Sequence, residues 1–225
     1  MRGVWPRDTR RDVTLIGALA VAGVLFPAVA AAQGGAALVL ETSGVPGVRP
    51  YSELRPGASV ILGSSARLVF LHYATCRTVT LEGGRVTLAA DSYTVAGGAG
   101  VRETPTACPR LVTRRSSGDV VVGGVVTRSL GPTLALPPAP ELVLVGARAG
   151  DYALARIAGE NGEPHEVGLE GPRLRWPAGV PPLTVGGVYE LRLVPSRGDG
   201  RAVTLRFQVT RPQAAQEPIT VIHVE

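Results

Sequence analysis

The sequence contains no lysine: all 23 of its basic side chains are arginine, and Asn161 is its only asparagine. We interpret this composition as the codon bias of a GC-rich bacterial genome and not as a functional adaptation. Aromatic residues make up only 4% of the chain, and four of the arginines lie in the first twelve residues. Nucleic-acid-binding proteins combine a basic face with stacking aromatic side chains. The sequence offers neither, so it predicts no nucleic-acid partner.

Residues that hold metals or attack substrates are also scarce. The chain has two cysteines and one methionine, and its three histidines are widely separated, at His72, His165 and His223. Zinc and copper sites need such ligands in clusters at characteristic spacings. Ser64 and Ser65 lack the G-x-S-x-G pattern of a hydrolase serine, and no glycine-rich stretch has the spacing of a phosphate loop. We therefore expect no catalytic, metal-binding or cofactor-binding residue, and no enzyme.

The first 32 residues have the three-part form of a secretory signal peptide. A basic start, MRGVWPRDTRRD, is followed by an apolar run that ends in small residues at Ala28, Ala30 and Ala32. We expect cleavage between Ala30 and Gln33, which leaves a mature chain with no stable membrane span. An uncleaved anchor is the alternative, because residues 13–32 are long enough to cross a bilayer. The leader predicts a periplasmic or secreted bacterial protein.

The mature chain is expected to be all-β. Short runs of valine, threonine and leucine alternate with glycine and proline, and no long stretch has helical spacing. In residues 66–73, ARLVFLHY, the alternation places Phe70 and His72 on one face of a strand and Leu71 and Tyr73 on the other. Residues 77–90, RTVTLEGGRVTLAA, predict two strands joined by a tight turn at Glu82-Gly83-Gly84, because glycine supplies the positive φ that such a turn needs.

A proline-rich stretch divides the mature chain. Residues 130–140, LGPTLALPPAP, cannot supply all the backbone donors of a central strand and are the best candidate for a linker. The predicted organisation is a signal peptide at 1–32, a β domain at 33–129, the linker at 130–140 and a β-sandwich at 141–225.

The second domain contains a pattern typical of Greek-key sandwiches. In PLTVGGVYELRL, Leu183, Gly186 and Tyr189 have the L-x-x-G-x-x-Y spacing of a tyrosine corner, where the tyrosine hydroxyl bonds to the backbone just upstream. The pattern predicts an immunoglobulin-like or fibronectin-like sandwich. The alternative is a glycine and a tyrosine that precede an ordinary strand by chance.

The first domain contains an L-x-x-G stretch at Leu54–Gly57, followed by an expected strand at 59–62, a small-residue turn at 63–66 and a strand at 67–73. Over residues 36–95 this order of elements resembles the FecR-type periplasmic domain. It implies a small, non-catalytic β domain of the kind found in envelope signalling and beside other exported β modules. We expect the chain to depart from the signalling members by lacking an N-terminal cytoplasmic region and an internal membrane span, which argues against relay to a sigma factor.

Cys76 can be a nucleophile, a metal ligand or one half of a disulfide. A nucleophile needs a thiolate beside a base, and His72 is not well placed to be that base. In an oxidising compartment two cysteines most often pair with each other. We therefore favour a disulfide between Cys76 and Cys108, which would tie an irregular segment to the hairpin region.

Two other groups of side chains allow a functional and a structural interpretation. An acidic group could hold calcium or act as paired carboxylates, but it lacks the spacing of a calcium loop and is better explained as a solvated hairpin with its flanks: Glu160, Glu163, Glu166 and Glu170. Trp176, the only tryptophan of the mature chain, could be a platform for a sugar. We favour a role in the core, because an apolar-alternating strand lies beside it.

Three functions follow from the sequence. The favoured one is a non-catalytic binding or structural β module whose partner is an envelope protein or a cell-wall component. The second is a sensor or regulatory subunit of an envelope signalling system, as the FecR resemblance implies. The third is a hydrolase with an unrecognised cysteine or serine site.

Overall fold

The computed structural model describes residues 34–98, 100–114, 120–122, 125–126, 134–160, 162–197, 202–212 and 218–224. The predicted signal peptide and its cleavage region therefore lie outside the described residues. Residues 33–225 group into a single compact unit by their contacts. The strands of this unit form two sheets, and the described part of the chain contains no α-helix.

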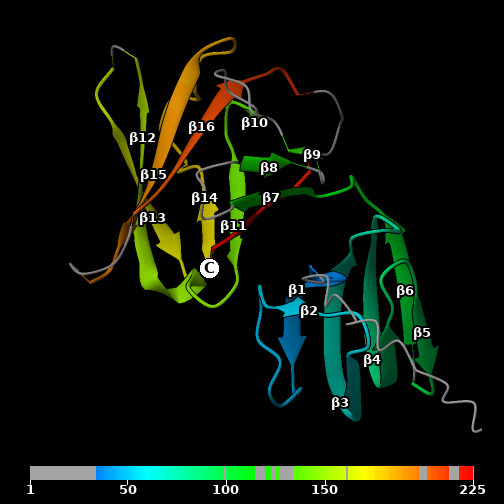
Figure 1. Ribbon diagram of the computed structural model, residues 1–225. Coiled ribbons are helices and arrows are strands. Elements are labelled where there is room, and N and C mark those ends of the chain that lie inside the picture. The colour runs from blue at the N-terminus through cyan, green and yellow to red at the C-terminus, as the bar shows by residue number, and fades with distance from the viewer. Residues whose placement is uncertain are drawn as a thin grey trace, which may run out of the picture. The chain divides into compact units, whose positions relative to one another are not determined.

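The first sheet is built from six strands in the order β2-β1-β3-β4-β5, with β6 also paired to β4 (Figure 1). Their bounds are Ala37–Ser43 (β1), Glu53–Leu54 (β2), Ser59–His72 (β3), Arg77–Leu88 (β4), Tyr93–Ala96 (β5) and Gly100–Pro105 (β6). All pairings in this sheet are antiparallel. Strands β3 and β4 form its long central hairpin.

The alternation predicted in β3 is present, and side chains on both faces of its C-terminal end are buried. Phe70 belongs to the core of the first sheet and is fully buried, as is His72. Leu71 points to the opposite face, where it joins a second apolar cluster together with Tyr73. This second cluster is shared with the other sheet, so one strand contributes side chains to two separate apolar layers.

The prediction of a turn at Glu82-Gly83-Gly84 is wrong, because β4 runs without interruption from Arg77 to Leu88. Gly83 and Gly84 do have positive φ, at 66° and 83°, but they kink the strand where its partner changes from β6 to β5. A Cβ on Gly84 would lie 2.6 Å from the carbonyl oxygen of Gly97. The glycine is therefore required by a close backbone approach and not by a chain reversal.

The small-residue turn expected at residues 63–66 is also not a turn. These residues lie inside β3, where the register with β4 shifts between Leu62 and Arg67. The shift places residues 63–66 of β3 opposite the single residue Gly83 of β4, as in an enlarged β-bulge. Small side chains thus accommodate a bulge in a continuous hairpin.

The second sheet has the strand order β10-β16-β15-β12-β13-β14-β11-β17-β7-β8-β9 among the described residues. The strands are Arg110–Arg114 (β7), Val120–Val122 (β8), Val125–Val126 (β9), Leu134–Leu136 (β10), Glu141–Val145 (β11), Tyr152–Gly159 (β12), His165–Glu170 (β13), Arg173–Arg175 (β14), Val188–Pro195 (β15), Val203–Val209 (β16) and Thr220–His223 (β17). A short 3-10 turn, Ala149–Asp151, precedes β12.

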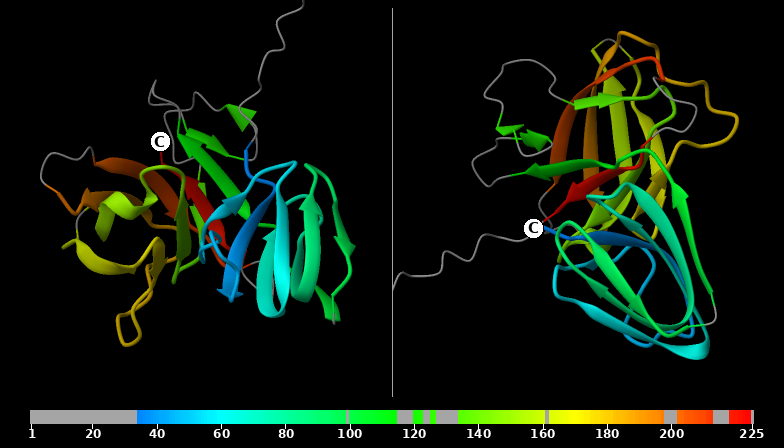
Figure 2. Two further views of the ribbon diagram at one scale, coloured as in Figure 1. Left: turned by 90° about the horizontal axis from the view of Figure 1, so that it is seen from below. Right: turned by 90° about the vertical axis from the view of Figure 1, so that its right-hand side faces the viewer.

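This second sheet curls around one core, to which β10 at one end of the strand order and β7 near the other end both contribute (Figure 2). Alternate residues of β15 and β16 point inward, and Leu191, Leu205 and Phe207 are almost fully buried there. They pack in the same cluster as Leu144 of β11 and Ile222 of β17. The prediction of an all-β protein with a sandwich fold is confirmed.

The C-terminal strand β17 lies inside the sheet and not at its edge. It pairs in parallel with β11 on one side and with β7 on the other. Strand β7 precedes residue 129, where we expected the first domain to end, yet it belongs to the second sheet. The chain therefore passes from the first sheet to the second between Pro105 and Arg110.

The expected linker at 130–140 is described only from residue 134 onward. Leu134–Leu136 forms β10, which pairs in parallel with β16 at the end of the sheet order. Pro137 and Pro140 are buried and Pro138 accepts a hydrogen bond from Leu183 N (2.8 Å). Prolines flank an edge strand here, as they can without loss of a ladder bond.

The disulfide between Cys76 and Cys108 is present, with 4.6 Å between its Cα atoms. Cys76 lies at the tip of the β3–β4 hairpin and has a φ of 50°. Cys108 lies in the segment that leads from the first sheet to the second, and Thr106 N donates to Cys76 O (3.0 Å) beside it. The bridge thus anchors the crossing segment to the hairpin tip.

We expect the double substitution Cys76→Ser with Cys108→Ser to lower the free energy of unfolding by about 3.5 kcal/mol, because the bridge closes a loop of 32 residues. Urea unfolding of the variant and of the oxidised protein measures the difference. The reduced wild-type protein should match the variant. Equal stability of all three forms would show that the bridge contributes nothing.

We expect Ile222→Ala to lower the free energy of unfolding by about 3 kcal/mol, because Ile222 is 0% exposed in β17 and its truncation leaves a cavity. Ile61→Ala is the matched control, since Ile61 is 63% exposed. The control should change stability by less than about 0.5 kcal/mol. Similar losses for both variants would contradict the central position of β17.

Candidate functional site

An apolar cluster joins the two sheets. Its buried members are Leu38 and Leu71 of the first sheet and Val143, Val145 and Val221 of the second, all at most 2% exposed. These residues come from β1, β3, β11 and β17. Burial of such side chains stabilises each by about 1.5–3 kcal/mol relative to exposure, so the cluster holds the first sheet against β11 and β17.

Glu53 of β2 lies at the polar border of this cluster. Tyr73 donates a hydrogen bond from its hydroxyl to Glu53 Oε1 (2.7 Å), and His223 Nε2 of β17 lies 3.4 Å from the same oxygen. The side chains of Glu53 and His223 are only 13% and 14% exposed. Burial, followed by the charge and the hydrogen bond of Glu53, raises the pKa of Tyr73 well above its ordinary value. Tyr73 therefore remains a neutral donor.

A second polar contact crosses from the loop before β2 to β14. Arg173 donates from Nε to Glu141 Oε1 (2.8 Å), makes a further bond to it through Nη2, and donates from Nη1 to the Tyr51 hydroxyl (2.9 Å). Burial alone would lower the pKa of Arg173, but the hydrogen bond and charge of Glu141, supported by Tyr51, raise it overall. Tyr51 has a φ of 61°, a strained conformation for a tyrosine that this contact holds in place.

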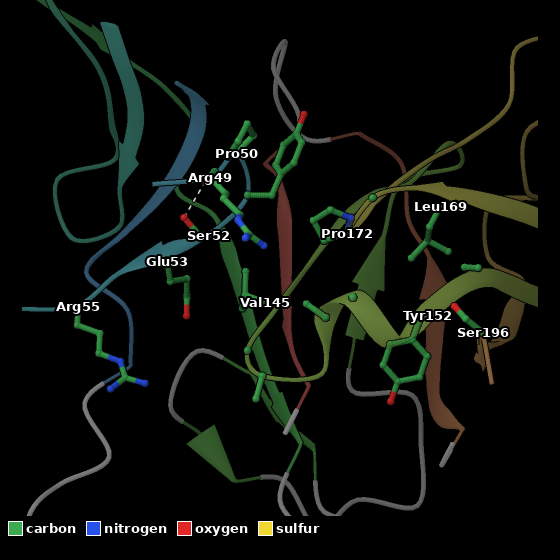
Figure 3. A pocket seen from close by; sticks show the side chains of 17 residues that line it. Arg49, Pro50, Ser52, Glu53, Arg55, Val145, Tyr152, Leu169, Pro172 and Ser196 are labelled. Carbon is green, nitrogen blue, oxygen red and sulfur yellow. Dashed lines mark hydrogen bonds between the residues drawn. The ribbon is translucent and has the colours of Figure 1, made fainter. Parts of the chain in front are cut away.

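A cleft of about 760 Å³ opens beside these contacts. Figure 3 shows Arg49, Glu53 and Arg55 along one side of it, and Tyr152 and Leu169 on the other. The first side belongs to the loop before β2 and to β2 itself. The second side comes from β12, from β13 and from the turns at 146–150 and 171–172. The volume lies within the range of small-ligand sites.

The cleft carries a net positive charge. Arg49 and Arg55 are exposed, and within the described ranges neither guanidinium has an ion-pair partner. Glu53 is the only acidic residue among those that line the cleft, and it is already engaged by Tyr73 and His223. An anionic group would therefore find two uncompensated cations at this surface.

The three residues of the predicted tyrosine corner meet at the start of β15. Thr184 N donates to the Tyr189 hydroxyl (3.1 Å), Gly186 has a φ of 87° and Leu183 is 4% exposed. The hydroxyl thus accepts a bond from the backbone five residues upstream. This corner lines none of the cleft and acts on the sandwich alone.

The remaining candidates do not assemble into a site. Trp176 is buried in the core of the second sheet, donates from Nε1 to Val180 O (3.3 Å) and packs its ring against His165, so the structural interpretation of this residue holds. Two of the four glutamates form ion pairs with arginines, Glu160 with Arg206 of β16 and Glu166 with Arg156 of β12. Within the described residues, no three histidine, cysteine or acidic side chains converge as metal ligands would.

Sequence reasoning missed the cleft. Its walls come from residues 49–55, 145–153, 169–172 and 196, which only the fold brings together. The one available indication was the pair of arginines on either side of Glu53, in VRPYSELRPG, because they bracket a short strand with like charges. Nothing in the sequence places this strand opposite the turns of the second sheet.

Comparison with family models, with curated proteins and with solved structures found no match to this chain. Within the described residues, no helix has the length and apolar character needed to cross a bilayer. The disulfide fits an oxidising compartment.

We expect the free energy of unfolding to fall as the pH rises above about 10, where an unfolded tyrosine loses its proton. The folded protein keeps the proton of Tyr73 to higher pH, and burial together with Glu103 raises the pKa of Tyr93 to about 12. Because folding favours the protonated form, stability is complete below pH 10 and is lost above it. The variant Tyr73→Phe should show a shallower decline in urea unfolding between pH 9 and 12. A wild-type stability that stays constant over this range would contradict the assignment.

Proposed function

We propose that the chain is a non-catalytic binding protein of the bacterial envelope, periplasmic or secreted, whose partner occupies the cleft between β2 and the turns of the second sheet. The observation that carries the proposal is the cleft itself, about 760 Å³ in volume and lined by two arginines without ion-pair partners among the described residues. The predicted signal peptide and the disulfide support the location. The partner is an envelope protein or a cell-wall component.

The proposal assigns no chemistry to the cysteines or to the serines of the cleft. A cysteine nucleophile needs a free thiolate, and the sulfur atoms of Cys76 and Cys108 are joined to each other. Ser52 lines the cleft, but its hydroxyl donates to Arg49 O (2.7 Å) in a turn-stabilising bond. These contacts favour binding over hydrolysis as the role of the site.

A sensor or regulatory subunit of an envelope signalling system is the second candidate. The resemblance of residues 36–95 to the FecR-type domain favours it, and Gly57, with a φ of 85°, occupies the glycine position of the L-x-x-G stretch. Leu54 of that stretch is buried in the core of the first sheet. A neighbouring gene for a sigma factor or an outer-membrane receptor would support this function over simple binding.

To test the binding proposal, we would place a photo-crosslinking amino acid at Ala147, which is exposed and lines the cleft. The full-length precursor would be expressed in its native host and irradiated there. We expect a discrete adduct from this position. Ala90 and Ala178 are matched controls, since both are exposed and neither lines the cleft. Equal adducts from all three positions, or none from position 147, would contradict a partner in the cleft.

A further inference from the structure

We infer that the cleft binds an extended acidic peptide segment, which adds to the outer edge of β2 and is held by Arg49 and Arg55. The inference rests on the proposed binding function and names the class of partner. It depends on three features of the described residues: an open strand edge, two flanking cations and an apolar wall.

The open edge is at Glu53. Val39 N donates to Ser52 O (2.9 Å) and Ala36 N donates to Leu54 O (2.7 Å), so both neighbours of Glu53 face β1. In an antiparallel pair this makes Leu38 and Glu53 a non-hydrogen-bonded pair. The N–H and C=O groups of Glu53 therefore point away from β1. Strand β2 is the last in the sheet order, and no described strand pairs with this side.

An unpaired strand edge selects a polypeptide as the partner. An extended peptide can offer an N–H and a C=O group at matching spacing and so complete the ladder. A glycan has no repeating backbone donor and acceptor of this kind. The strand edge lies among the residues that line the cleft, so a peptide paired to it would occupy that volume.

The charges on both sides of this edge select an acidic sequence. Arg49 and Arg55 lie at either end of the segment that includes β2 (Figure 3), and both are exposed without an ion-pair partner in the described ranges. Glu53 keeps its negative charge, but the two arginines outnumber it, and its carboxylate is turned to Tyr73 and His223. Arginine also binds carboxylates in a bidentate manner, which favours glutamate or aspartate at the flanking positions.

The far wall accommodates the intervening side chains. Leu169 and Pro172, both partly exposed, supply apolar surface opposite β2. Side chains of an extended peptide alternate between two faces, so acidic residues can meet the arginines while the others contact this wall. Burial of that apolar surface would add to the charge attraction.

The experiment measures fluorescence anisotropy of the oxidised mature protein with a labelled octapeptide of alternating glutamate and threonine. We expect saturable binding that weakens as salt is raised, because exposed charges are screened. A glutamine–threonine peptide should bind at least about tenfold more weakly, as should a glutamate–threonine peptide with alternate backbone amides methylated. Equal binding of the methylated peptide, or of an oligogalacturonate of equal charge, would overturn strand addition.

Substitutions locate the peptide. Arg49→Gln and Arg55→Gln should each weaken binding about tenfold, with the melting temperature unchanged because both side chains are exposed. Arg85→Gln is the matched control, since Arg85 is an exposed strand arginine that does not line the cleft. No binding of the acidic peptide, or equal losses in all three variants, would overturn the inference. A cleft-specific adduct from position 147 with no binding of acidic peptides would leave the proposed function intact while this inference fails.

Discussion

The packing of Leu38 and Leu71 against the valines of β11 and β17 is the contact on which the rest of the structure depends. Each sheet has its own core, and among the described residues this is the one cluster that gives the two sheets a common apolar layer. The polar contacts at its border, from Glu53 to His223 and from Tyr51 to Arg173, are made by partly buried side chains, where a hydrogen bond is electrostatically stronger than in water. The cleft exists only while the cluster is formed, since its two walls belong to different sheets.

The packing between the sheets explains why a tyrosine, Tyr51, occupies a position of positive φ in the loop before β2. Tyr51 adopts a positive φ that would favour glycine, yet its ring and hydroxyl both contact Arg173. Glycine at this position would relax the backbone but lose both contacts. Strain at one residue is thus balanced by a contact between sheets.

Local features of this protein could be predicted from the sequence better than the pairing of its strands. The alternation around Phe70, the pairing of Cys76 with Cys108 and the bond to the Tyr189 hydroxyl follow from local periodicity, compartment and turn chemistry, and all are present. The glycines at 83–84 misled the prediction because a kink and a tight turn require the same backbone conformation. The cleft could not be predicted, because its walls are brought together by the pairing and packing of strands far apart in the sequence. Such long-range partners, of which β7 and β17 are an example, leave no periodic pattern in the sequence.

The position of β17 also has a consequence for the order in which the chain acquires its structure. All strands of the first sheet precede residue 106, so this sheet can form as soon as that length of chain has emerged, and the disulfide can close shortly afterwards. The position between β7 and β11 is filled by β17, so the second sheet is incomplete until residues 220–223 have been made. Its completion depends on contacts of very large sequence separation, which form slowly. Until residues 220–223 are in place, β7 and β11 each expose an unpaired edge that invites aggregation.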